Sequence, residues 1–253
     1  MNTDSSPNKS ILIIENDVIN SAFLNLSISK LLKNDYTIYI AESATKALDL
    51  ISNTNPKLII LNHYLPDMKG TELAKKIKLQ YSYNIKIIML TSLDPSDIQT
   101  KLINYIDDFI IIPATIDSIY HVLKRTLPIK ENTSDSFFND KINQPKLHFN
   151  KEVFYEKIGN EQDFIKFIFK AFFRNFMTSL NKIKESLNCK DRDLYFKNIH
   201  YLKGETSTLC LEIINQDINE LEKIAFESTE EIQSILLKIK NEFLWLQKNN
   251  IPF

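Results

Sequence analysis

The segment NIHYLKGETSTL, residues 198–209, places four chemically different residues at the spacing of one helix face. His200, Lys203, Gly204 and Ser207 occupy positions i, i+3, i+4 and i+7, which lie on the same side of an α-helix. A neutral imidazole is a nucleophile near pH 7 without a separate base, and an ammonium group neutralises charge on transferring phosphoryl oxygens. The segment therefore predicts phosphoryl transfer at His200, with an ordinary surface or core histidine as the alternative.

The glycine of this segment is a second sign of a site. The chain contains only three glycines, and a glycine inside a helix costs about 1 kcal/mol relative to alanine. Gly204 therefore indicates a need for space beside the histidine. The same scarcity argues against a glycine-rich phosphate-binding loop, and no Walker, dinucleotide or kinase ATP-binding motif is present in the sequence.

A second candidate site lies in the stretch KLIILNHYLPDMKG, residues 57–70, where a buried-strand pattern ends at Asn62. The carboxyl ends of parallel strands are where α/β proteins usually keep their reactive groups, so an acid is expected there rather than a neutral amide. A polar run follows the apolar residues 11–14 in the same way, and it reads Glu15, Asn16, Asp17.

The elements that must position these residues differ between the two halves of the chain. Up to residue 127, short apolar runs alternate with amphipathic stretches, which predicts five βα units and a parallel sheet covered by helices on both faces. Strands are predicted at 11–14, 37–41, 58–61, 86–90 and 109–112, and helices around 18–33, 44–52, 70–80, 95–104 and 115–125.

Residues 128–146 are polar and without periodicity, which predicts a linker. Beyond them the apolar residues recur at helical spacing, and we expect an all-α four-helix bundle preceded by a short helix near 150–158. The four bundle helices are predicted at 161–187, 191–210, 212–227 and 230–248. The first of them holds six of the chain's sixteen phenylalanines, and Phe169 and Phe173 fall off its main apolar stripe. We expect these two to pack on the leading helix, with a docking surface beside the histidine as the alternative.

Residues 147–250 resemble the histidine phosphotransfer (HPt) domain, because H-x-L-K-G falls in the second helix of the predicted bundle. The resemblance implies that His200 accepts a phosphoryl group from a receiver aspartate and passes it on. It also implies that Lys203 supports the phosphate, that Gly204 lets the partner approach, and that partners are receiver domains of hybrid histidine kinases or response regulators. Mg²⁺ is then expected on the partner, with no cofactor bound by this chain. One departure is Cys210, where the family often has glycine.

Residues 8–127 resemble a response-regulator receiver domain through the five βα units, the acidic run after the first strand and the loop N-x-x-x-P-x-M-x-G. The resemblance implies a doubly wound (βα)5 fold. Further matches are Glu15 and Asp17 in the acidic run, Thr91 at the end of the fourth strand, Phe109 at the switch aromatic and Pro113 after the lysine position.

The chemical residues of that family are replaced at three positions. Asn62 stands at the phospho-acceptor aspartate, Asn16 at an acid that helps to hold Mg²⁺, and Ile112 at the lysine. An amide cannot attack phosphorus as a carboxylate does, and a lysine in a pocket short of counter-charge would be costly. We therefore interpret this half as a pseudo-receiver that is neither phosphorylated nor metal-bound. The alternative is a weak metal site built from Glu15, Asp17 or Asp67.

The combined prediction is a phosphorelay protein that is a phosphotransfer intermediate rather than an enzyme, loaded in trans by a partner receiver. The receiver-like half is expected to serve regulation or protein interaction, including a possible homodimer through the face formed by residues 95–127. Two alternatives remain open. The protein could bind and block a kinase or response regulator with His200 unused, or it could drain phosphate by accepting and then losing it.

Composition narrows the remaining classes. The net charge of −1, with 43% hydrophobic and 25% charged residues, provides no broad field for nucleic acid or an anionic membrane. The polar start MNTDSSPNKS and the lack of a run of ~20 apolar residues predict a cytoplasmic protein. Cys189 and Cys210 are too few for a disulfide framework or a zinc site. His63, His121 and His148 have no supporting neighbours in the sequence, and we expect them to be ordinary histidines.

Overall fold

The computed structural model describes residues 9–33, 35–81, 84–91, 104–112, 114–127, 147–224, 226 and 228–252. The chain divides into two compact units, Met1–Phe137 and Phe138–Phe253, and each is described by itself. The helix predicted over 95–104, apart from Asn104, lies outside the described residues. The predicted linker over 128–146 and Pro113 also lie outside them.

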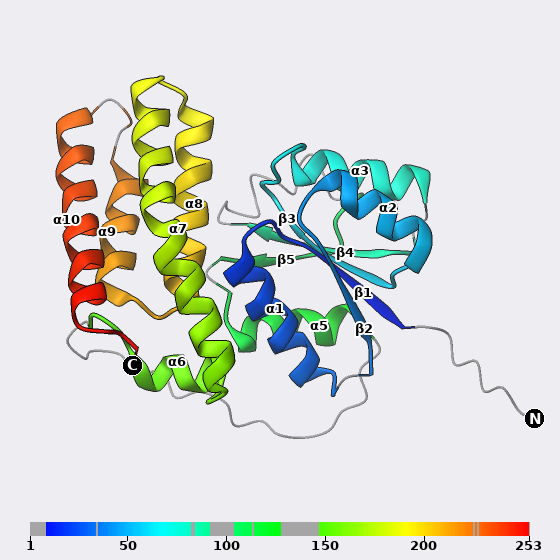
Figure 1. The fold of residues 1–253 in the computed structure, drawn as a ribbon. Helices are drawn as coiled ribbons and strands as arrows, with labels where there is room; N and C mark the ends of the chain where they lie inside the picture. The colour runs from blue at the N-terminus through cyan, green and yellow to red at the C-terminus, as the bar shows by residue number, and fades with distance from the viewer. Residues whose placement is uncertain are drawn as a thin grey trace, which may run out of the picture. The chain divides into compact units, whose positions relative to one another are not determined.

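The amino-terminal unit is built on a five-stranded parallel sheet, as the sequence predicts (Figure 1). Its strands follow the order β2-β1-β3-β4-β5, and every neighbouring pair is parallel. The strands β1 and β3 are buried along their whole length, which explains why their sequences are continuous apolar runs rather than alternating ones. The strands are β1 Ser10–Ile14, β2 Thr37–Ala41, β3 Leu58–Asn62, β4 Lys86–Thr91 and β5 Asp108–Ile111.

Helices cover both faces of this sheet. In Figure 1, α1 and α5 lie on one side of the strands, and α2 and α3 lie on the other. Three of these helices begin at side-chain caps, since Asp17, Ser43 and Thr115 accept hydrogen bonds from backbone N–H groups at the starts of α1, α2 and α5. The helices are α1 Val18–Leu31, α2 Ala44–Thr54, α3 Gly70–Gln80 and α5 Ile116–Thr126.

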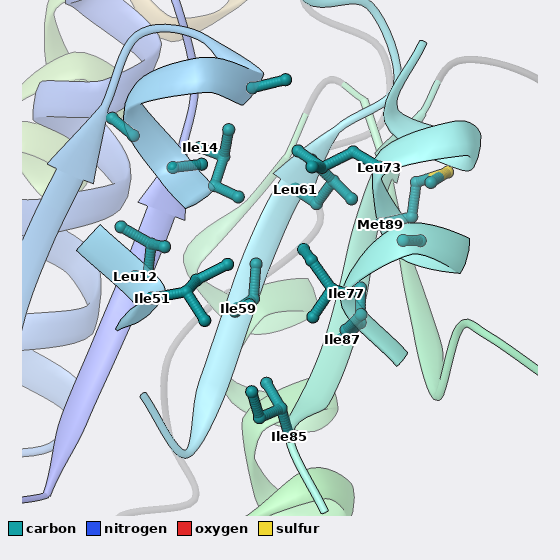
Figure 2. Close-up of a cluster of buried hydrophobic side chains, with 14 of the residues drawn as sticks. Leu12, Ile14, Ile51, Ile59, Leu61, Leu73, Ile77, Ile85, Ile87 and Met89 are labelled. Atoms are coloured by element: carbon teal, nitrogen blue, oxygen red, sulfur yellow. The ribbon is translucent and has the colours of Figure 1, made fainter. Parts of the chain in front are cut away.

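The core on the α2–α3 side is an aliphatic cluster between the sheet and these helices (Figure 2). Alternate residues of three adjacent strands point into it, because successive side chains of a strand face opposite sides of a sheet. Figure 2 labels Leu12 and Ile14 of β1, Ile59 and Leu61 of β3, and Ile87 and Met89 of β4 among its members. The core holds the three central strands in register, and this register fixes which residues meet at their carboxyl ends.

The carboxy-terminal unit is helical in its described residues, with a short leading helix and four longer ones (Figure 1). The helix α7 contacts α8, α8 contacts α9, α9 contacts α10, and α10 contacts α7, so the four longer helices close a ring. Connections of a few residues join consecutive helices, which favours antiparallel neighbours. The helices are α6 Lys151–Ile158, α7 Gln162–Asn188, α8 Arg192–Thr208, α9 Glu212–Lys223 and α10 Thr229–Lys248.

Aromatic side chains fill the interior of this unit. Phe176 of α7 stacks on Phe243 of α10 with ring centroids 4.0 Å apart, and Phe172 meets both rings edge-on. Phe169 is buried against Phe154 of the leading helix at 5.4 Å, so its predicted packing there is confirmed. Phe173 instead contacts Phe243 at 5.7 Å and Phe172 at 5.6 Å.

None of the helices within the described residues combines the length and apolar character that a membrane crossing needs.

Candidate functional site

Strand register brings the receiver-like residues to one edge of the sheet. Ile14 of β1 pairs with Leu61 of β3, so the next residues along each strand, Glu15 and Asn62, are neighbours. Across the sheet, Asn62 pairs with Leu90, the residue before Thr91. Thr91 in turn pairs with Ile111, and its carbonyl oxygen accepts a hydrogen bond of 2.9 Å from the backbone N–H of Ile112.

Glu15 and Asn62 are bound to each other inside the protein. The Asn62 Nδ2 amide donates to both carboxyl oxygens of Glu15, at 3.0 and 2.9 Å, and the backbone N–H of Asp17 donates to Glu15 Oε1 at 2.9 Å. Burial raises the pKa of Glu15 from 4.5 to about 8, and the nearby Asp17 carboxylate adds to the rise against these hydrogen bonds. This edge therefore favours a neutral, protonated carboxyl.

The other two carboxylates that could rebuild a metal site are already engaged as helix caps. Asp17 Oδ1 accepts from the backbone N–H groups of Ile19 and Asn20 at the start of α1. Asp67 accepts from the backbone N–H groups of Ala44 and Thr45, and from the Thr45 hydroxyl, at the start of α2. In the described part of the chain, no three His, Cys, Asp or Glu side chains gather as metal ligands would. Asp17 and Asp67 thus act as helix caps at this edge of the sheet.

Two further polar groups at this edge are buried without a hydrogen-bond partner among the described residues, the Asn16 Oδ1 and His63 Nδ1 atoms. Burial lowers the pKa of His63 to about 4, and the positive charge of Lys69 adds to the effect. The imidazole is therefore neutral at pH 7. His63 does lie in the loop after β3, as predicted, but it is a buried residue of that loop rather than an exposed one.

Gly70 keeps the loop after β3 closed. A Cβ atom at this position would lie 2.3 Å from the Asn62 carbonyl oxygen, a distance that real side chains do not adopt. The Gly70 backbone N–H donates to the His63 carbonyl oxygen at 2.7 Å, which brings the two backbones together. The glycine of the N-x-x-x-P-x-M-x-G loop is therefore required by packing, independently of any phosphoryl chemistry.

The second candidate site lies on α8, where His200, Lys203, Gly204 and Ser207 share one helix as predicted. Asp191 caps the start of the helix by accepting from Leu194 N–H, and Asn198 Nδ2 donates to the Lys182 carbonyl oxygen of α7. His200 is buried, with 3% of its surface exposed, and Gly204 is buried one turn further along. His200 is therefore largely covered by neighbouring groups in this structure.

Two side chains of α9 complete this site, and sequence reasoning missed both. Lys203 Nζ lies 2.5 Å from Glu222 Oε2, so the predicted phosphate-supporting cation is already part of an ion pair. Asn215 Oδ1 accepts from the hydroxyl groups of Thr206 and Ser207, at 2.6 and 3.0 Å. The acidic and amide residues of α9 give no local signal, because their partners lie on another helix.

Cys210 occupies the position where the HPt family often has glycine, and its backbone has the conformation that favours glycine. The residue has a φ of 55°, the left-handed conformation that favours glycine, and its N–H donates to the Ser207 carbonyl oxygen just past the end of α8. The turn after α8 is therefore formed with a cysteine in the left-handed position. Burial raises the pKa of the Cys210 thiol, which lies just beyond the carboxyl end of α8.

His148 has structural contacts in the helical unit that the sequence did not predict. Its ring stacks on Trp245 with centroids 3.6 Å apart, and its Nδ1 atom lies 2.5 Å from Glu242 Oε1. Nearby, Glu212 accepts from the Leu147 N–H. The segment that enters the helical unit is thus fixed to α9 and α10. His121 pairs with Asp117, one turn away on α5.

Comparison with known proteins gives a family match over the first unit. The family model described as the response regulator receiver domain matches residues 11–124. Sporulation initiation phosphotransferase F of Bacillus subtilis (strain 168) is 29% identical over 127 residues, which are 49% of this chain and 98% of the relative. Response regulator ArlR of Staphylococcus haemolyticus (strain JCSC1435) is 30% identical over 151 residues, which are 56% of this chain and 67% of the relative.

Solved structures are similar over the same share of the chain. The signal receiver domain of an HD domain-containing protein from Pseudomonas fluorescens Pf-5 is 25% identical, with a TM-score of 0.40. The match covers 47% of this chain and 86% of that structure.

Proposed function

Because this chain belongs to the response regulator receiver family, through residues 11–124, we propose that it is a phosphorelay protein whose transferable phosphoryl group is carried by His200. Receiver domains interact with histidine kinases and response regulators, and the receiver match supports a place in two-component signalling. The observation that carries the proposal is the α8 face, where a histidine, a cation and a glycine stand within about one turn of each other. The carboxy-terminal unit would then act as an HPt domain.

The proposed transfer needs few groups from this chain. The unprotonated ring nitrogen of His200 attacks the phosphorus of a partner's aspartyl phosphate, and a P–N bond forms as the P–O bond breaks. The aspartate carboxylate leaves with the bonding electron pair, and the other ring nitrogen of His200 keeps its proton. Lys203 balances charge on the phosphoryl oxygens, and Gly204, one turn after His200, is the position at which the resemblance implies room for the partner. Mg²⁺ and the remaining catalytic groups would come from the partner receiver.

In this proposal the receiver domain is not phosphorylated. Asn62 offers an amide where an attacking carboxylate is needed, and its Nδ2 group is already committed to both oxygens of Glu15. Ile112 is buried at the position where the family resemblance implies a lysine. Asp17 and Asp67 are used as helix caps. Because the Glu15 carboxyl favours its protonated form and the Asp17 and Asp67 carboxylates cap helices, the role of this edge would be interaction rather than chemistry.

A direct test is a phosphotransfer profile against every receiver domain of the same cell, each first loaded with acetyl phosphate. We expect at least one to pass acid-labile phosphate to the full-length protein, and the label to be absent from His200→Gln. His121→Gln is the matched control, because His121 is an exposed histidine on α5. Equal labelling of wild type and His200→Gln would exclude His200 as the acceptor.

A second candidate function is favoured by the burial of His200 and the pairing of Lys203 with Glu222. Both observations are expected of a stoichiometric regulator that binds a kinase or response regulator while its histidine stays unused. This protein would bind the same receiver with equal affinity as wild type and as His200→Gln, and neither form would take up phosphate. Isothermal titration calorimetry beside the transfer profile separates the two functions.

The receiver domain would contribute an interaction face along β5 and α5. Ile111 is exposed on the edge strand β5, and Arg125 of α5 pairs with Asp108 of β5 at 2.9 Å. We expect Ile111→Lys to weaken self-association, with sedimentation velocity as the measurement. A wild-type protein that stays monomeric at all concentrations would exclude the homodimer.

A further inference from the structure

The ion pair between Lys203 and Glu222 joins two helices beside the proposed phosphoryl acceptor. Their charged atoms lie 2.5 Å apart, and the side chains are 15% and 26% exposed. Lys203 is on α8, one turn after His200, whereas Glu222 is near the carboxyl end of α9. The lysine that would stabilise a phosphoryl group on His200 therefore already has an anionic partner.

Phosphorylation of His200 would place a second anion within reach of the same ammonium group. A phosphoryl group carries more negative charge than a carboxylate, so it competes with Glu222 for the Lys203 ammonium. While Lys203 stays with Glu222, phospho-histidine lacks part of its charge compensation. If Lys203 moves to the phosphoryl group, the ion pair with Glu222 is lost. Either outcome raises the free energy of the phosphorylated form relative to a site without the carboxylate.

We propose that Glu222 is a positioning residue that acts through Lys203 to lower the stability of phospho-His200, and so keeps transfer to and from partner receivers reversible. This inference rests on the proposed function of His200. Glu222 holds Lys203 beside the acceptor in the resting protein and competes for it after phosphorylation. The glutamate does not contact the reacting atoms in this role, and its effect requires the lysine.

The experiment uses full-length protein and phosphoramidate, which phosphorylates imidazoles without a protein partner. A ring nitrogen of His200 forms a new P–N bond as the P–N bond of N-protonated phosphoramidate breaks, and ammonia leaves with the bonding electron pair. At fixed phosphoramidate and ammonium concentrations, ³¹P NMR gives the ratio of phospho-His200 to free His200. Glu222→Gln removes the carboxylate charge and keeps a side chain of the same shape that can accept a hydrogen bond from Lys203.

We expect Glu222→Gln to raise this ratio about fivefold, the factor that corresponds to a partly exposed ion pair. Glu220→Gln, which removes a charge from the same helix, should leave the ratio within twofold of wild type. The decisive comparison is made in a Lys203→Met background, where Glu222→Gln should change the ratio less than twofold. There the partly exposed Glu222 carboxylate has lost its cation and can turn to solvent.

Each outcome has a defined meaning. A wild-type protein that gives no phospho-histidine signal beyond that of His200→Gln overturns both the proposed function and this inference. A labelled wild type with an unchanged ratio in Glu222→Gln overturns the inference alone, as does an equal rise in the Lys203→Met background. A merely structural salt bridge would lower the urea midpoint of Glu222→Gln without raising the ratio.

Discussion

Replacement of Glu15 by glutamine should change how the stability of the receiver domain depends on pH. The Glu15 carboxyl is buried at the carboxyl end of β1, and its hydrogen bonds come from the neutral Asn62 amide and from backbone N–H groups. Ile112 occupies the position where the receiver resemblance implies a lysine. No positive charge from that position therefore stabilises the ionised form of Glu15. Glutamine keeps the shape and an acceptor oxygen but cannot ionise.

The sign follows from the shifted pKa. The folded state holds the Glu15 proton up to about pH 8, whereas the unfolded chain releases it near pH 4.5. The stabilisation is therefore complete below about pH 4.5, and it is lost as the pH rises toward 8. Each pH unit in this window costs ~1.4 kcal/mol. The free energy of unfolding of Glu15→Gln, measured relative to wild type, should therefore rise by roughly 3 to 4 kcal/mol between pH 5 and pH 8.

The free energies of unfolding of wild type and Glu15→Gln must be compared at each pH, because His63 changes the pH dependence of stability in the opposite direction. Its pKa is lowered from 6.5 to about 4, so the fold favours the neutral imidazole. That contribution is present above about pH 6.5 and is lost as the pH falls toward 4. In wild type the two effects offset each other at acid pH. Subtracting wild type from Glu15→Gln leaves the Glu15 contribution, since His63 is present in both.

The assay is urea unfolding of the full-length protein at pH 5, 6, 7 and 8, read by pulsed hydrogen–deuterium labelling and mass spectrometry. Peptides within residues 9–33 and 57–81 report on the receiver domain separately from the helical unit. Glu42→Gln is the matched control, because Glu42 is an exposed residue that pairs with Lys46. A constant offset between Glu15→Gln and wild type at every pH would refute the burial argument. A free energy of unfolding of Glu15→Gln that falls relative to wild type as the pH rises would refute its sign.

Three further substitutions test other contacts of the structure. Asn62→Asp places a second carboxyl against Glu15, so we expect the free energy of unfolding in urea to fall by about 2 kcal/mol. We also expect this variant to take up no hydroxylamine-labile phosphate from acetyl phosphate. Uptake of phosphate would contradict the pseudo-receiver interpretation. Gly70→Ala should cost about 1–3 kcal/mol by the same pulsed assay, because its Cβ would meet the Asn62 carbonyl oxygen at 2.3 Å. Lys190→Gly should stabilise the helical unit by about 1 kcal/mol in urea melts followed by circular dichroism, because exposed Lys190 has a φ of 54°; an unchanged midpoint would argue against that conformation.

Much of the fold follows from local pattern, and the limits of that pattern are visible at element ends. Runs of four or five mostly apolar residues predict all five strands, and the observed strands begin and end within one residue of prediction. The fifth strand is Asp108–Ile111 rather than 109–112, so it begins and ends one residue earlier than predicted. The helix predicted over 212–227 ends at Lys223, because Ile224 adopts an extended backbone at the C-cap. These shifts depend on backbone geometry that side-chain periodicity does not encode.

The candidate sites were predictable where sequence order fixes the geometry. Parallel strands in register bring the residues after each strand together, so the strand pattern alone assigns Glu15 and Asn62 to one edge of the sheet. The side-chain partners could not be assigned in this way. Asp67 caps α2 across 22 and 23 positions, and His148 meets Glu242 across 94. Such contacts depend on how helix faces pack, and a carboxylate gives the same local pattern whether it caps a helix or faces solvent.

The two candidate sites differ in their charged groups, and this difference supports different proposed roles for them. At the sheet edge, Asn62 and Ile112 stand where the receiver resemblance implies an acid and a cation, and burial favours the protonated form of Glu15. In the proposed pseudo-receiver, this edge would therefore not take part in phosphoryl transfer. On α8 the charge is kept as the pair of Lys203 and Glu222. Because an ion pair can exchange one anion for another, any response of this chain to phosphate is expected on α8, and the receiver domain is left to respond through the surfaces that it presents to partners.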